Sequence, residues 1–69
     1  MIIVNTGGNI VNFDNILSLT NENNALVGIT PTGYKIYIEI FNETKIAEEY
    51  VKQIRKAYSI KQTEFIIGG

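Results

Sequence analysis

Residues 34–58, YKIYIEIFNETKIAEEYVKQIRKAY, contain the two elements that decide the fold. Apolar and polar side chains alternate over Tyr34–Phe41, which predicts a strand. Its core-facing row is predicted to be Tyr34, Ile36, Ile38 and Ile40. From Asn42 onward the apolar period becomes helical, with one stripe made of Ile46, Ala47, Tyr50, Val51, Ile54, Ala57 and Tyr58. A strand followed by an amphipathic helix is therefore expected.

The helix is predicted to span Lys45–Tyr58, with Asn42 as its N-cap, because asparagine accepts backbone hydrogen bonds well at that position. Phe41 and Ile46 would then occupy the two positions of a hydrophobic staple. Tyr50 and Tyr58 lie on the apolar stripe and are predicted to belong to the core.

Shorter apolar runs on both sides of this stretch predict further strands, over residues 2–5, 9–13, 16–20, 25–30 and 63–67. Gly7-Gly8 predicts a hairpin turn, and Thr30–Gly33 has proline and glycine where type I turns favour them. Tight turns cannot join parallel strands. The expected fold class is α+β: a small, mostly antiparallel sheet of about five strands packed by one C-terminal helix, with a short final strand, in a single domain over residues 1–69.

Composition limits the classes of function. Six basic and seven acidic residues give a net charge of −1, which argues against general nucleic-acid binding. No apolar run is long enough to cross a membrane, and the sequence predicts a cytoplasmic protein. The chain has 69 residues and no cysteine, so its core is small and contains no disulfide. Small domains of this kind are often stabilised by association, and we expect a homo-oligomer.

The chain contains neither histidine nor cysteine, which removes the usual nucleophile and base pairs and the usual zinc ligands. Gly7-Gly8 lies between two strands and lacks the lysine and hydroxyl residue of a phosphate-binding loop. We therefore expect a non-enzymatic protein with no cofactor, no metal and no catalytic residue.

Binding residues are predicted from cationic and aromatic side chains. Tyr37 lies opposite the isoleucine row, and phenols are enriched at interfaces. A site for a small signalling nucleotide could draw on Lys35, Tyr37, Arg55, Lys56 and Lys61. A surface for a host protein could instead use Tyr34, Tyr37 and Phe41.

The segment Ile10-Val11-Asn12-Phe13-Asp14-Asn15, after the short run at residues 2–5, resembles the opening of a group of small uncharacterised proteins from low-GC bacteria and their phages. The likeness covers most of the chain, since a helix and a short last strand follow in the same order. The group has no settled activity. A phage setting implies action in the host cytoplasm, as an anti-defence inhibitor that binds a host defence factor or sequesters a signalling nucleotide.

Two alternatives stay open. Gly68-Gly69 after a strand looks like the tail of ubiquitin-like sulfur carriers, which are adenylated on a C-terminal diglycine. Those carriers place their helix directly after the first hairpin, whereas five strands are predicted to precede it here. The second alternative is a structural assembly domain with no small-molecule ligand.

Overall fold

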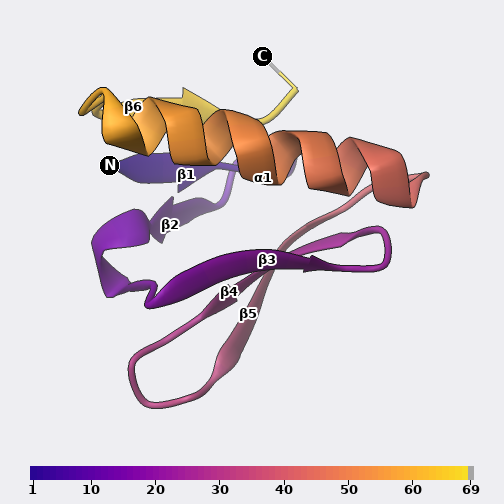
Figure 1. The fold of residues 1–69 in the computed structure, drawn as a ribbon, viewed down its shortest axis with the longest axis horizontal. Coiled ribbons are helices and arrows are strands. Elements are labelled where there is room, and N and C mark those ends of the chain that lie inside the picture. The colour runs from indigo at the N-terminus through magenta and orange to yellow at the C-terminus, as the bar shows by residue number, and fades with distance from the viewer. Residues whose placement is uncertain (69) are drawn as a thin grey trace.

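The computed structural model describes residues 1–68 and has the predicted α+β class (Figure 1). Its elements in chain order are β1 (Ile2–Val4), β2 (Ile10–Asn12), a 3-10 helix η1 (Phe13–Asn15), β3 (Ser18–Glu22), β4 (Ala25–Ile29), β5 (Lys35–Ile40), α1 (Thr44–Ser59) and β6 (Glu64–Ile66). The strands form two three-stranded sheets, ordered β2-β1-β6 and β3-β4-β5, so the expected single sheet of about five strands was wrong.

The division into two sheets begins at η1. The side chain of Asn12 accepts a hydrogen bond from the backbone N–H of Asp14, at 3.0 Å, and this cap starts a helical turn directly after β2. The turn ends the first hairpin and redirects the chain, so β3 does not pair with β2. Asn and Asp make such local bonds readily, which is why they interrupt strands.

The N-terminal sheet combines a hairpin with a long-range parallel pair. β1 and β2 are antiparallel around the Gly7-Gly8 turn, where Gly8 has a φ of +81°. β6 pairs with β1 in parallel, Ile3 opposite Phe65. A parallel neighbour requires a long crossover, and the second sheet together with α1 supplies it.

The second sheet is an antiparallel meander with a β-bulge. Leu26 pairs with Glu39 but Val27 pairs with Tyr37, so Ile38 is an extra residue in β5. Beyond a bulge the alternation of side chains shifts by one. Ile38 faces the core as predicted, at 1 % exposure, whereas Ile40 lies beyond the bulge, is 67 % exposed and does not face the core as predicted.

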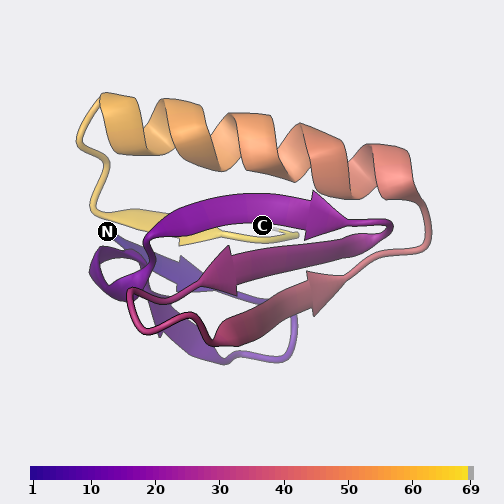
Figure 2. The ribbon, with the colours of Figure 1, turned by 60° about the horizontal axis from the view of Figure 1, so that its bottom comes forward.

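The core lies between the two sheets and the helix. Figure 2 shows the meander in front of the N-terminal sheet, with α1 running along the top of both. Its fully buried side chains include Ile3 from β1, Leu26 from β4 and Ile54 from α1. Gly28 makes the close approach that glycine in a strand suggests, because a Cβ there would lie 2.7 Å from Cδ1 of Ile16.

The helix begins one residue before the predicted Lys45, but its N-cap is not the predicted residue. Thr44 is its first residue and Glu43 its N-cap, without a side-chain cap bond, so Asn42 is not the cap. The backbone N–H and carbonyl of Phe41 both bond to Asn24, at 2.8 and 2.6 Å, which keeps the chain extended after β5. No helix among residues 1–68 has the length and apolar character needed to cross a membrane.

Candidate binding site at the carboxyl end of the helix

Two hollows meet at Tyr58, in the last turn of α1. The first, about 450 Å³, is lined by Met1, Tyr58, Ser59, Lys61, Gln62 and Thr63. The second, about 330 Å³, is lined by Tyr58 and Arg55 and by a group of apolar side chains from η1, β3 and the segment between them: Phe13, Ile16, Leu17 and Leu19. The Tyr58 ring therefore lies between two hollows whose lining is mainly apolar.

Tyr58 is 55 % exposed, so its predicted place in the core was wrong. One part of its ring is packed, since its centroid lies 5.0 Å from that of Phe13, with the planes tilted by 42°. The rest remains open because the last turn of α1 extends beyond the fully buried part of the helix, which ends at Ala57. An open ring fixed by an aromatic neighbour is suited to stack with a flat ligand.

Lys61 is held beside this ring by the end of the helix. The backbone N–H groups of Lys61 and Gln62 donate to the carbonyls of Tyr58 and Ala57, at 3.1 and 3.0 Å. These are the two bonds of a Schellman motif, in which the residue at the Lys61 position takes a left-handed conformation and is usually glycine. Lys61 has a φ of +59°, so a lysine occupies a strained backbone position there.

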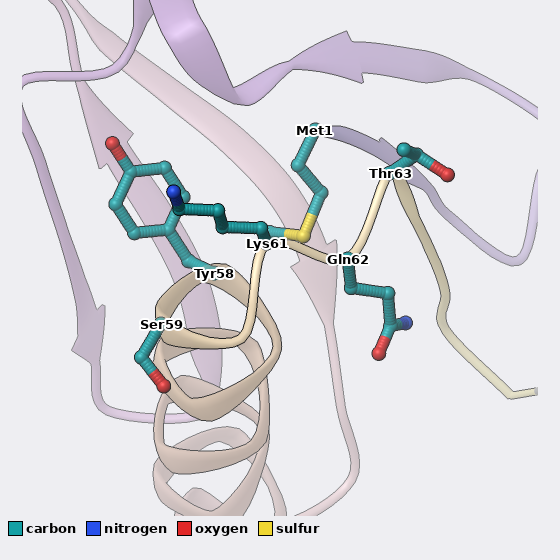
Figure 3. A pocket seen from close by; sticks show the side chains of 6 residues that line it. All are labelled: Met1, Tyr58, Ser59, Lys61, Gln62 and Thr63. Atoms are coloured by element: carbon teal, nitrogen blue, oxygen red, sulfur yellow. The ribbon is translucent and has the colours of Figure 1, made fainter.

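Figure 3 shows that the Lys61 and Tyr58 side chains extend in the same direction from the end of α1, while Ser59 and Gln62 point away. Within residues 1–68, neither Lys61 nor Arg55 forms an ion pair. Each hollow thus contains one cation whose charge no carboxylate neutralises. Such a pair of cations around an aromatic ring can attract an anionic ligand.

The structure brings together only part of the predicted set of binding residues. Lys61 lines the first hollow beside Tyr58, and Arg55 lines the second. Lys56 is exposed on the same helix but lines neither hollow. Phe41 stacks on Tyr50 against the core, with centroids 4.9 Å apart, and is therefore not a free anchor.

The remaining predicted residues lie on β5 and the turn before it. Lys35 Nζ forms an ion pair with Glu22 at 2.6 Å, and that hydrogen bond, together with the charge of Glu22, raises the pKa of Lys35. The Tyr37 hydroxyl lies 3.5 Å from the same carboxylate and its ring is 59 % exposed. Tyr34 is 73 % exposed and does not face the core as predicted. This cluster belongs to the outer face of the meander.

Sequence reasoning did not select Tyr58, Phe13 or Leu17 for the site. Phe13 and Leu17 fit strand patterns in the sequence. The Asn12 cap places Phe13 in a 3-10 turn instead, and its contact with Tyr58 joins distant parts of the chain. One signal was available for Tyr58: it is the last member of the apolar stripe, at the end of the helix, where burial commonly fails.

The diglycine alternative can be compared with the contacts of Gly68. Its N–H donates to the Tyr50 hydroxyl at 3.2 Å, and a Cβ there would lie 3.2 Å from Cγ2 of Thr6. The preceding Ile67 is 3 % exposed. These contacts hold Gly68 against the body of the protein, whereas a carrier must present its tail to an enzyme. Gly69 lies outside the described residues, and the carrier function stays a prediction.

No cluster of three or more acidic side chains within residues 1–68 is placed to hold a metal ion. Comparisons of the chain with models of protein families, with curated proteins and with solved structures found no match. The resemblance to small phage and low-GC bacterial proteins therefore stays a prediction.

Proposed function

We propose that this chain is a non-enzymatic binding protein that sequesters a small anionic ligand with an aromatic group, of which a signalling nucleotide is the leading example. The observation that supports it is the open Tyr58 ring between two hollows, each with one unneutralised cation. A base would stack on Tyr58, and phosphate oxygens would bind Lys61 and Arg55. In a phage setting, removing such a ligand would weaken host defence.

The positions of the predicted aromatic anchors favour a small ligand over a host protein as the partner. Anchors of a protein interface cluster in one desolvated patch. Here Phe41 is half-buried and stacked on Tyr50, and Tyr37 lies over the meander beside Glu22. The predicted anchor cluster of Tyr34, Tyr37 and Phe41 is therefore divided, whereas the aromatic and cationic groups around Tyr58 share one place.

The first test uses the strained position of Lys61. In Lys61→Gly the Schellman position receives its preferred residue, so the free energy of unfolding should stay unchanged or rise by up to about 1 kcal/mol. Binding of a nucleotide should weaken about tenfold or more, since one charged hydrogen bond contributes about 1.5–3 kcal/mol. Urea unfolding and NMR titration with adenosine monophosphate measure the two effects. A variant that binds as tightly as the wild type would remove Lys61 from the site.

The second test is a matched pair of charge substitutions on adjacent helix residues. Arg55→Gln should weaken binding of adenosine monophosphate about tenfold or more, because it removes the cation of the second hollow. Lys56→Gln removes the same charge at a position that lines neither hollow, and should change affinity less than about twofold, by screened electrostatics alone. Equal losses in both variants would mean that net charge, rather than a site, attracts the ligand.

Titrations with adenosine and with inorganic phosphate separate the two halves of the proposal. Each should bind more weakly than adenosine monophosphate, because adenosine lacks the anion and phosphate lacks the ring. Phosphate binding as tight as nucleotide binding would contradict a stacking role for Tyr58.

A further inference from the structure

The outer face of the N-terminal sheet is an apolar surface that no described element covers. Residues directly opposite one another across a sheet share a face. Val4 pairs with Ile10 on one side and with Ile66 on the other, so the three form a row across the sheet. Ile2 follows on the same face, between Asn12 and Glu64. We call these four apolar residues and their two polar neighbours the outer row.

The outer row faces away from the core. The opposite face of this sheet carries Ile3, Val11 and Phe65, which pack into or against the core cluster. By contrast Ile10 is 65 % exposed and Ile66 is 52 % exposed. An apolar sheet face at this exposure is a typical interaction surface.

We propose that a second copy of this chain covers the outer row, the two copies being related by a two-fold axis along β1. That operation places β6 of one copy over β2 of the other. Ile66 then meets Ile10 of the second copy, and Val4 and Ile2 meet their own equivalents. Every apolar residue of the row is covered by another apolar residue, as an isologous interface requires.

The polar pair of the outer row supports the same arrangement. The two-fold operation sets Glu64 opposite Asn12 of the second copy. The Asn12 side-chain oxygen already accepts from the N–H of Asp14, at 3.0 Å, so its NH₂ group is left to donate. The Glu64 carboxylate is an acceptor that forms no ion pair within residues 1–68. A donor and an acceptor thus meet at each edge of the apolar row.

The size of the chain favours this occupant. A domain of 69 residues buries a small share of its surface, and association through an apolar sheet face is a common supplement to such a core. The row has one charge, Glu64, and no cation. A strongly acidic or basic partner therefore finds little complementarity on it, whereas a second copy satisfies both its apolar and its polar groups.

The test compares four variants with the wild type by sedimentation equilibrium over a range of concentrations. The wild type should reach twice the chain mass of 7.7 kDa. Ile66→Lys should weaken dimerisation about a hundredfold or more, because it buries a cation in the apolar row. Ile40→Lys is the control, since Ile40 is 67 % exposed on the other sheet, and it should leave the dimer unchanged.

A polar substitution tests the register of the pair without touching the apolar row. Asn12→Asp keeps the acceptor for the Asp14 N–H but sets a carboxylate opposite Glu64, so dimerisation should weaken about tenfold or more. Adding Glu64→Lys to Asn12→Asp turns the repulsion into an ion pair and should restore the dimer.

Three results would overturn the proposal: a wild type that stays monomeric at every concentration, a dimer that Ile40→Lys disrupts and Ile66→Lys does not, and a double variant no better associated than Asn12→Asp. The first would also be found if a lipid surface or another protein covered the row instead. The binding site at Tyr58 shares no residue with the outer row, so nucleotide titrations are an independent measurement.

Discussion

Leu26→Ala is expected to lower the free energy of unfolding by about 2–5 kcal/mol, which is the range for deleting a buried leucine side chain. Leu26 lies in the central strand of the meander, is 0 % exposed, and belongs to the same core cluster as residues of the helix and of the other sheet. Its truncation would leave a cavity where all three layers meet. For a chain of 69 residues the whole stability is about 3–10 kcal/mol, so the variant would be marginal.

Urea unfolding followed by circular dichroism measures this loss, with Ile40→Ala as the control. Ile40 is on the neighbouring strand but 67 % exposed, so removal of the same number of carbon atoms should change stability by no more than about 0.5 kcal/mol. Equal losses of stability in the two variants would contradict the outward orientation of Ile40 and the bulge in β5 that produces it.

Tyr58→Ala should reduce the affinity for adenosine monophosphate by about 5- to 150-fold, because stacking of a base on an aromatic side chain contributes about 1–3 kcal/mol. The expected loss is large because the same ring borders both hollows. Phe13, whose centroid lies 5.0 Å away, borders only the second hollow and cannot replace it in the first.

The control for this variant is Tyr34→Ala, at the turn before β5, where the ring is 73 % exposed and borders neither hollow. Its affinity should match that of the wild type. NMR titration of both variants measures the effect, and their circular dichroism spectra check that each is folded. Equal affinities for Tyr58→Ala and the wild type would contradict the site.

Local patterns predicted the local elements of the fold well. The helix stripe, the Gly7-Gly8 hairpin and the turn at Thr30–Gly33 depend on neighbouring residues, and the structure contains all three. The N-cap differed because Asn24, 17 residues earlier in the chain, bonds the backbone of Phe41. A contact of that kind leaves no periodic signal in the sequence.

The arrangement of the strands was less predictable. The alternation in β5 reads as uninterrupted, yet the bulge at Ile38 turns Ile40 outward. The division into two sheets depends on one side-chain cap, from Asn12 to Asp14, which could equally have been part of a loop between paired strands. The parallel pairing of β6 with β1 joins the two ends of the chain, and no short pattern indicates it.

The sequence predicted two cations of the candidate site correctly, but it did not predict which aromatic ring lies beside them. Arg55 and Lys61 were chosen as cations and do lie beside an open aromatic ring. The ring is Tyr58 and not the predicted Tyr37, because the helix extends past its buried segment while Tyr37 lies over the meander beside Glu22. The left-handed backbone at Lys61 could not be foreseen from a lysine, which rarely adopts it.

The most direct test of the central claim, that Tyr58 and its two cations capture a nucleotide-like anion, is native mass spectrometry of protein incubated with the small-molecule extract of bacterial cells. We expect a native mass above the denatured mass by one or more nucleotide-sized increments, and the increment should disappear in Tyr58→Ala and in Lys61→Gly. A native mass equal to that of the bare chain or its dimer, or an increment that persists in both variants, would contradict the proposed function.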